Sequence, residues 1–348
     1  MGIVGQPYDS ARSNTNSSNP RIGGFVQVKY ELNPSIRVNL GIRAGYFKYT
    51  DFSWISPRLG VQYSLSPVSF LNLAYGRHFQ TPNLIELAFD SDNDNLRSKY
   101  NDQFVMGLEH FFSKDTRGTF EAYWKTYSDI PVNFTETTPD SSDRSFKLVN
   151  EGHAKSYGVE LFLQKKMAKD FFGTFSYSWY RAFNQDVRSD DEKYYPQTFD
   201  FQHVASIVGG YRIPLKGTNI IPISKRNGLV RFIAKALGWG SDELELSFRY
   251  RYVGGKPYTP LSYNHNVQRW YEDPTAEYNT ERLIAYHRFD IIILWHSNYE
   301  KFNVISYFDL QNCFNRDNIW DIQWNADGTQ SDIYQYKVFP VGGFTIEF

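Results

Sequence analysis

The sequence predicts an all-β fold, an antiparallel up-and-down β-barrel that crosses a membrane with its strands. Three observations favour this class. Apolar and polar residues alternate over runs of about eleven residues, longer than most soluble strands and close to a tilted membrane-spanning strand. Aromatic residues make up 18% of the chain, although its mean hydropathy is −0.52. Tight turns and long polar connections also follow one another in a regular order.

Composition excludes several other classes. No run approaches the roughly 18 apolar residues that a membrane helix requires. A barrel strand is apolar on one face only, and its aromatic residues gather in girdles, so a polar mean hydropathy is compatible with a barrel. A large soluble all-β protein is the alternative at this stage. The net charge of −1 gives no indication of nucleic-acid binding, and the single cysteine, Cys313, allows no internal disulfide.

The stretch from Ser56 to Leu87 shows the unit from which the chain is built. Its two arms meet at Ser66-Pro67-Val68, which predicts a β-hairpin with one apolar face and a tight turn. The apolar positions that alternate in the two arms are Leu59, Val61, Tyr63, Leu65, Leu71, Leu73 and Tyr75. After Gln80 a long polar segment follows, and it continues to about Asn101.

The remaining elements repeat this pattern in order, which gives about 13 to 14 strands in all. Two arms at 22–32 and 36–46 come first and meet at Asn33-Pro34-Ser35. The later arms are predicted at 104–112, 119–127, 156–165, 171–183, 203–214, 244–252, 289–295, 302–314 and 343–348. We expect the 302–314 arm to continue through 319–325 into a hairpin turn at Ala326-Asp327-Gly328-Thr329.

Long connections fall at one end of the predicted sheet if the strands run up and down. They cover 80–101, 129–145, 184–198, 254–286 and 315–333. This asymmetry is typical of bacterial outer-membrane barrels, which have short periplasmic turns and longer extracellular loops. A propeller would show a repeat of about 40 to 45 residues, and the sequence has none.

One connection at the short-turn end is long. Residues 215–242 are predicted to form a periplasmic-side insertion with a short amphipathic helix, because apolar residues recur there at helical spacing. This helix lies on the inner membrane surface or packs under the barrel mouth. The apolar positions are Leu229, Phe232, Ile233, Ala236 and Leu237.

Several segments together resemble the C-terminal barrel of TonB-dependent outer-membrane receptors. They are SPRLGVQYSLSPVSFLNLAYGRHFQTPNLIEL at 56–87, NEGHAKSYGVELFLQKK at 150–166, FDFQHVASIVGGYRI at 199–213, SFRYRYVGGKPYTP at 247–260, FDLQNCFNRDNIW at 308–320 and the ending FPVGGFTIEF. The resemblance implies a barrel of about 22 strands that holds an N-terminal plug. It also implies uptake of a scarce solute, such as a ferric siderophore, cobalamin or a glycan, without chemistry.

The predicted arms, about 13 in number, form an odd count, whereas such a barrel has an even number of strands. Met1 to Pro7 also lack the basic and apolar regions of a secretory signal. We therefore expect 1–348 to be a single barrel portion, without its plug, its TonB-contacting segment, its first strands and its signal peptide. A complete smaller barrel with one further strand in Met1 to Pro20 is the alternative.

Candidate ligand contacts lie in the long connections. Exposed aromatic side chains of loops bind sugars, haem-like rings or siderophores, although barrel rims carry aromatic girdles in any case. The candidates are Trp270, Tyr271, Trp320 and Trp324, together with Gln80, Asn83 and Glu86, which follow a strand where the resembled family often lines its binding cavity.

Other residues are candidates for contacts with the plug and for assembly. Arg58, Arg77, Arg249 and Arg251 are predicted to face the lumen, where they either meet a plug or line a solvated channel wall. Phe348 closes the last strand and resembles the signal that the barrel-assembly machinery recognises. Its alternative role is that of one more lipid-facing aromatic residue.

Neither an enzyme site nor a metal site is indicated by the sequence. His203 lies near Asp200, but no nucleophile stands at a recognisable spacing, and the seven histidines form no ligand motif. We expect no cofactor. The expected partners are a small-molecule cargo at the extracellular face, TonB, the assembly machinery and outer-membrane lipid. An outer-membrane barrel enzyme and a passive pore or adhesin are the alternative functions.

Overall fold

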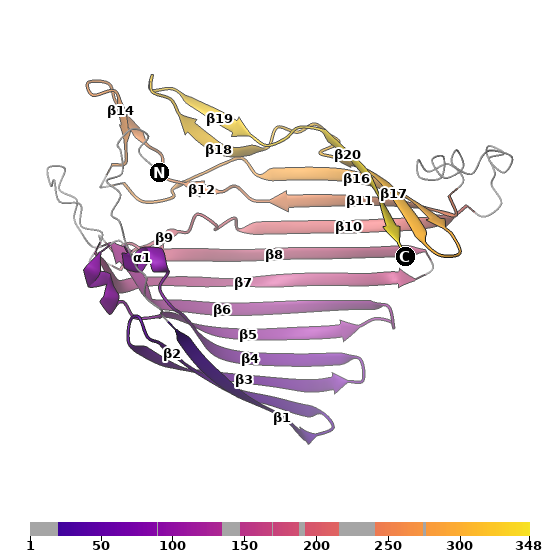
Figure 1. Cartoon of the computed structure of the whole chain (residues 1–348), viewed down its shortest axis with the longest axis horizontal. Coiled ribbons are helices and arrows are strands. Elements are labelled where there is room, and N and C mark those ends of the chain that lie inside the picture. The colour runs from indigo at the N-terminus through magenta and orange to yellow at the C-terminus, as the bar shows by residue number, and fades with distance from the viewer. Residues whose placement is uncertain are drawn as a thin grey trace.

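The computed structural model describes residues 20–88, 90–133, 147–168, 170–187, 192–215, 241–273 and 276–348. Within them, one 14-stranded antiparallel sheet forms the body of the protein (Figure 1). β9 (Tyr194–Pro196) pairs only with β8. The other strands are β1 (Arg21–Asn33), β2 (Ile36–Phe47), β3 (Phe52–Ser66), β4 (Ser69–Gln80), β5 (Lys99–Phe111), β6 (Thr116–Asn133), β7 (Leu148–Ala168), β8 (Phe171–Gln185), β10 (His203–Pro214), β11 (Glu243–Val253), β16 (Tyr286–Asn298), β17 (Asn303–Gln311) and β20 (Phe339–Glu347).

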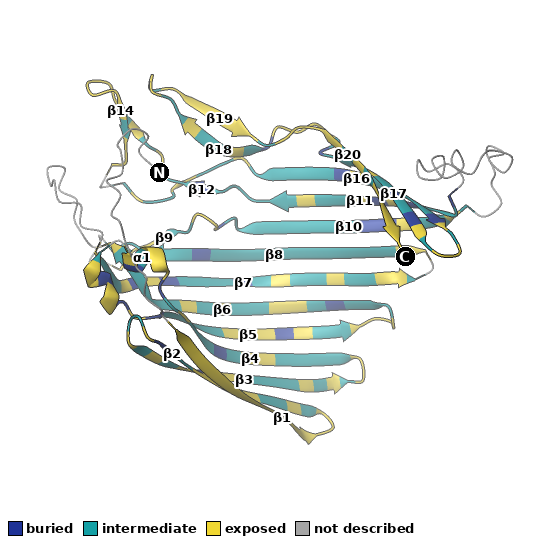
Figure 2. Cartoon of the chain, in the orientation of Figure 1, coloured by how far each residue is buried: buried dark blue, intermediate teal, exposed yellow. Residues whose placement is uncertain are grey.

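Strand order in the sheet follows the order of the chain, as an up-and-down barrel requires. The predicted fold class and the predicted number of strands are confirmed. The sheet curves into a wall, and its two edges are β1 and β20, which do not pair with each other in the described part of the chain (Figure 1). The sheet is therefore not closed, and β1 is exposed along its whole length (Figure 2).

Smaller elements gather at one end of the sheet, which we call the loop end (Figure 1). The C-terminus and the tight turns lie at the opposite end, so the predicted asymmetry of the connections is confirmed. At the loop end lie α1 (Leu84–Ala88), the 3₁₀ helix η1 (Ser91–Asn95), and the strand pairs β12 (Pro257–Tyr258) with β15 (Glu281–Arg282), β13 (Ser262–Asn264) with β14 (Arg269–Tyr271), and β18 (Ile319–Trp324) with β19 (Gln330–Tyr334).

The register of the strands separates two faces. One row of paired residues runs through Leu40, Leu59, Tyr75, Phe104 and Trp124, and we call this side the apolar face. Its large side chains are exposed, with Leu59 at 42% and Phe104 at 53%, as expected for a surface that lipid covers. The neighbouring row on the other side, the polar face, runs through Gly41, Arg58, Gly76, Gln103 and Lys125.

The predicted hairpin from Ser56 to Leu87 is confirmed as β3 and β4, but its polar continuation is more ordered than the sequence suggested. The backbone N–H of Asn83 donates to Glu86 Oε2 at 2.8 Å and so begins α1. Leu87 is then buried with Phe47 and Leu96 in a small loop-end core. The Asn-x-x-Glu spacing is a capping signal that could have predicted this helix.

The predicted amphipathic helix cannot be compared with the fold, because 216–240 lie outside the described residues. The residues on either side of this segment pair with each other. The Leu215 N–H donates to the Asp242 carbonyl oxygen at 2.8 Å, and Pro214 pairs with Glu243. The insertion therefore leaves and re-enters the sheet at the turn end, and the helix stays a prediction.

Two glycines allow three segments to cross closely where β11 ends. A Cβ atom on Gly254 would meet the Phe201 carbonyl oxygen at 2.0 Å, and one on Gly255 would meet that of Leu283 at 1.9 Å. No other residue type fits between these backbones without displacing them. The glycine pair thus fixes how the loop-end connections leave the sheet.

Candidate ligand site at the loop end

Aromatic side chains from two hairpins meet at the loop end. The rings of Trp270 on β14 and Trp324 on β18 lie 4.7 Å apart between centroids and are tilted by 60°. Tyr263 on β13 lies 5.1 Å from Trp270, and His265 lies 5.0 Å from Tyr263. We call these four residues the aromatic cluster. Each such ring pair contributes about 0.5 to 1.5 kcal/mol beyond the area that it buries.

Hydrogen bonds fix the two hairpins against each other. The Trp270 Nε1–H donates to the Asn325 carbonyl oxygen at 2.7 Å, and the Tyr263 hydroxyl donates to that of Ala326 at 2.5 Å. Gly328 sits under the Tyr263 ring with a φ of +86°, so a side chain there would be strained and would also collide with that ring. The predicted turn at Ala326 to Thr329 is confirmed, and it places Trp324 beside Trp270.

Asp327 holds this turn and gives it a pH dependence. The Thr329 hydroxyl donates to Asp327 Oδ1 at 2.6 Å and the Thr329 N–H donates at 3.0 Å, which together hold the pKa of the Asp327 carboxyl below its ordinary value of 3.8. The carboxylate therefore stabilises the turn above pH 3.8, and this contribution is lost as the pH falls through the lowered pKa.

We expect the tryptophan fluorescence of the full chain to stay constant from neutral pH down to about pH 4 and to change below it, because the turn under Trp324 then loosens. An acid titration of the wild type and of Asp327→Asn measures this. In the variant, the change in this pH window should disappear. An identical acid transition in both proteins would contradict the role of Asp327.

The other predicted ligand residues do not join the aromatic cluster. Tyr271 and Trp320 are 48% and 64% exposed, and in the described part of the chain no contact links either ring to the cluster. Gln80 ends β4, and Asn83 and Glu86 bond to each other at the start of α1, on another part of the sheet path.

A buried carboxylate, Asp200, connects the loop-end segments, a role that the sequence did not indicate. Asp200 is fully buried and accepts from the Ala182 N–H at 2.8 Å, from Arg181 Nε at 3.2 Å and from Arg282 Nη2 at 2.6 Å. His203 bonds separately to the Tyr177 hydroxyl at 2.8 Å. Asp200 and His203 therefore have different partners, and Asp200 ties β8 to β15.

Three of the four predicted lumen-facing arginines lie on the polar face. Arg249 bonds through Nε to Asp290 at 2.9 Å and through Nη2 to Asp309 at 3.3 Å. Arg251 lies opposite Arg288 in the register of β11 and β16, and it forms no ion pair with the described residues. Whether this face lines a lumen stays a prediction, because the sheet is not closed.

The prediction for Arg77 is wrong. Residues two apart on a strand share a face, so Arg77 lies with Tyr75 on the apolar face, opposite Arg58. Arg77 bonds to Asp102 through Nε at 2.9 Å and Nη2 at 2.6 Å, and it stacks 4.6 Å from the Tyr100 ring. This neutralised pair near the loop end explains why an arginine is tolerated on that face.

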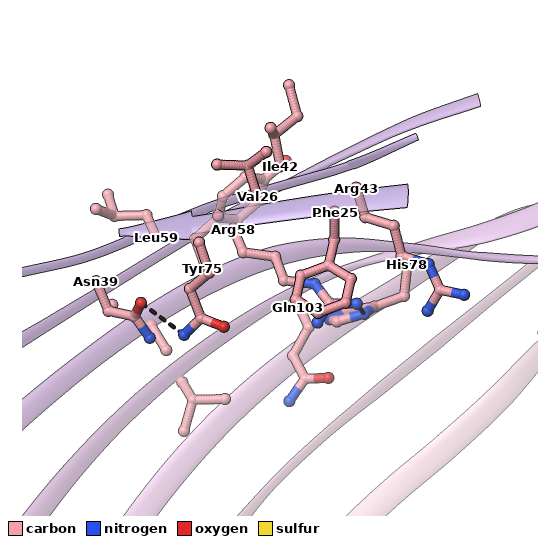
Figure 3. A pocket seen from close by; sticks show the side chains of 16 residues that line it. Phe25, Val26, Asn39, Ile42, Arg43, Arg58, Leu59, Tyr75, His78 and Gln103 are labelled. Atoms are coloured by element: carbon pink, nitrogen blue, oxygen red, sulfur yellow. Dashed lines mark hydrogen bonds between the residues drawn. The ribbon is translucent and has the colours of Figure 1, made fainter. Parts of the chain in front are cut away.

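Arg58 lines a cavity of about 420 Å³ formed by β1 to β5 (Figure 3). Arg58 Nη2 lies 3.5 Å from His78 Nδ1, and Gln27 bonds to Asn39 at 2.8 Å. In Figure 3 the Asn39 and Gln103 side chains lie on the other side of the strands from Val26 and Ile42. The cavity is thus a hollow of the wall that both apolar and polar side chains line, separate from the aromatic cluster.

Phe348 lies just beyond the end of β20 and is fully exposed, 6.4 Å from the Phe302 ring. Its role as an assembly signal stays a prediction. In the described part of the chain, no helix has the length and apolar character needed to cross a membrane. No cluster of three or more histidine, cysteine, aspartate or glutamate side chains there is placed to hold a metal ion.

The family model described as TonB dependent receptor-like, beta-barrel matches residues 2–336. The chain belongs to this family. The resemblance seen in the sequence segments is therefore confirmed. A comparison with curated proteins finds no match.

Solved structures with a similar fold are receptors and transporters. The pyoverdine outer membrane receptor of Pseudomonas aeruginosa PAO1, bound to pyoverdine, is 13% identical with a TM-score of 0.63 over 94% of this chain and 42% of its own. The ferric-catecholate import receptor Fiu of Escherichia coli K12 is 12% identical, with a TM-score of 0.59 over 94% and 43%. The FrpB iron transporter of Neisseria meningitidis is 14% identical, with a TM-score of 0.60 over 94% and 45%.

At these identities the similarity shows the fold alone. The present chain spans less than half the length of these three proteins, at 42%, 43% and 45% of their chains. The TonB-dependent receptor barrel accounts for the two-faced sheet and for the position of the long connections.

Proposed function

We propose that the chain forms part of the barrel wall of an outer-membrane TonB-dependent receptor that takes up a scarce solute. The observation that carries this proposal is the aromatic cluster, which two hairpins build at the loop end of a family barrel sheet. Two of the similar structures support a ferric siderophore as cargo, since one is bound to pyoverdine and another imports ferric catecholates. Cobalamin or a glycan is the alternative cargo.

The aromatic cluster suits a ligand with flat, apolar surfaces. Trp270 and Trp324 present large rings whose positions are fixed by the hydrogen bond to Asn325 and by the turn beneath them, so little conformational entropy is lost on binding. Tyr271, Trp320, Gln80, Asn83 and Glu86 are proposed as further contacts from neighbouring loops.

Transport in this proposal is inward and energised by TonB, and the protein is inserted by the barrel-assembly machinery through Phe348. The polar-face residues Arg58, Arg249 and Arg251 would then line the lumen or meet a plug. Among the described residues no catalytic constellation favours an enzyme, since Asp200 and His203 are engaged with other partners.

A binding titration tests the proposal. The full chain is titrated with a ferric catecholate, a ferric hydroxamate and cobalamin, and the quenching of its tryptophan fluorescence is recorded. We expect one probe to bind, and Trp324→Ala to weaken that binding by about 2 kcal/mol, or about thirtyfold in Kd, because the central aromatic anchor is lost.

Trp124→Phe is the matched control, because Trp124 lies on the apolar face within the sheet, away from the loops. It should leave the Kd unchanged. Equal binding by the wild type and Trp324→Ala would contradict the site, and the absence of binding with all three probes would contradict the proposed uptake of such solutes.

A further inference from the structure

Two cations lie side by side on the apolar face near the loop end. Lys155 on β7 and Arg181 on β8 both stack on the ring of Phe183, with Lys155 Nζ at 5.9 Å and Arg181 Cζ at 4.6 Å from its centroid. Lys155 Nζ also lies 3.8 Å from the Tyr194 ring. Charged side chains on a lipid-facing surface are costly near the bilayer midplane. The depth of these two cations in the membrane therefore determines which part of a lipid they can contact.

Their depth follows from the aromatic residues beside them. Trp124, Tyr157 and Trp179 form a continuous belt across β6, β7 and β8, with centroids 5.0 and 6.2 Å apart. Trp and Tyr prefer the boundary between hydrocarbon and headgroups. Lys155 lies two residues closer to the loop end than Tyr157, about 7 Å along β7. Arg181 lies two residues closer to the loop end than Trp179 on β8, and it pairs directly with Tyr157 across the strands. Arg181 is therefore level with the belt at the boundary of the headgroups, and Lys155 lies on the headgroup side of the belt.

Among the described residues, Lys155 and Arg181 have a single carboxylate partner between them. Lys155 forms no ion pair with the described carboxylates, and the rings of Phe183 and Tyr194 fix its position. Arg181 shares its only described carboxylate partner, Asp200, with Arg282. Two guanidinium groups thus face one carboxylate, and the Nη atoms of Arg181 form no hydrogen bond with the described residues. An anion beside Phe183 would relieve the repulsion between Lys155 and Arg181.

We propose that Lys155 and Arg181 bind the phosphate of an anionic lipid headgroup in the leaflet at the loop end. The ammonium group of Lys155 supplies a point charge, and the free edge of the Arg181 guanidinium supplies paired N–H donors for phosphate oxygens. The acyl chains then lie along the belt of Trp124, Tyr157 and Trp179. This inference rests on the membrane location in the proposed function, but not on any solute being transported.

Native mass spectrometry of the full chain in detergent micelles tests the site. The protein is titrated with dioleoyl phosphatidylglycerol, with dioleoyl phosphatidylcholine and with inorganic phosphate. We expect phosphatidylglycerol to bind most tightly and Lys155→Gln to weaken its binding about fivefold, the contribution of one basic residue at a membrane surface. Lys155→Arg should restore most of the affinity.

Lys125→Gln is the matched control. Lys125 also lies over a tyrosine ring, 4.6 Å from that of Tyr123, but it belongs to the polar face. Its loss should leave lipid binding unchanged. Equal weakening by both variants, or unchanged binding by Lys155→Gln, would overturn the site. Equal affinity for inorganic phosphate and for the lipid would overturn the choice of a lipid.

The test is independent of the cargo. Lys155→Gln should bind the solute probe as the wild type does, since Lys155 lies outside the aromatic cluster. A chain that binds lipid but no solute would contradict the proposed function and leave the lipid site standing. If the chain binds solute and Lys155→Gln retains full lipid affinity, the lipid site is contradicted and the proposed function stands.

Discussion

Asp290→Ala should lower the free energy of unfolding by about 3 to 5 kcal/mol, because it removes a buried carboxylate, leaves Arg288 without its described partner and leaves Arg249 with Asp309 alone. Asp290 is fully buried on the polar face. It accepts from Arg249 Nε at 2.9 Å, from Arg288 Nε at 3.0 Å and from the Asn312 N–H at 2.9 Å. The substitution would therefore weaken β11, β16 and the connection after β17 together.

Urea unfolding of the full chain in lipid vesicles, followed by tryptophan fluorescence, measures this effect. Asp317→Ala is the control, since Asp317 pairs with Lys337 at 2.9 Å while both side chains are more than half exposed. An exposed pair of this kind contributes at most about 1 kcal/mol. Equal shifts of the two unfolding midpoints would show that burial of Asp290 has no special role.

Asp200→Ala should lower the free energy of unfolding by a similar amount, about 3 kcal/mol. Its effect should be concentrated at the loop end. Arg282 also donates from Nη1 to the carbonyl oxygens of Asp200 and Gly255, so one arginine joins the segment before β10 to the segment after β11. Without the carboxylate, Arg181 and Arg282 repel each other across the same space. We expect the connections around β9 and β15 to separate from the sheet.

Limited proteolysis resolves this effect, because opened loops are cut long before the sheet unfolds. Cleavage between β8 and β10 and between β11 and β16 should become much faster in Asp200→Ala. Asp321→Ala is the control, since Asp321 also joins two loop segments through Lys256 at 3.3 Å, but in a pair that is partly exposed. Unchanged cleavage in Asp200→Ala would rule out this role for the buried carboxylate.

The sheet could be predicted almost completely from alternation, because few residues of each strand are buried and each strand presents two different faces. A run such as Leu71, Leu73 and Tyr75 predicts both the strand and the face that it turns toward lipid. The same rule, applied strictly, also gives the correct side for Arg77, two residues after Tyr75. The error came from assigning a charge to the lumen by its type, whereas its bidentate partner Asp102 belongs to the next strand.

The candidate site could be predicted only in part. Trp270 and Trp324 were found because aromatic residues in long polar connections are unusual, but nothing in the sequence says that the two rings meet. Arg282 and Asp200 are 82 residues apart, and the glycines at 254 and 255 matter only because Phe201 and Leu283 cross them. Contacts of this range depend on how loops fold over a finished sheet, so local patterns carry no signal for them.

The two indole rings of Trp270 and Trp324 have one more consequence. At 4.7 Å and 60°, their electronic transitions are close enough to couple and far enough from parallel to give a circular-dichroism couplet. The loop end therefore carries its own optical signature, distinct from the band of the strands. A bound molecule that slides between or over the rings changes the sign or size of that couplet, so occupancy can be followed without attaching a label.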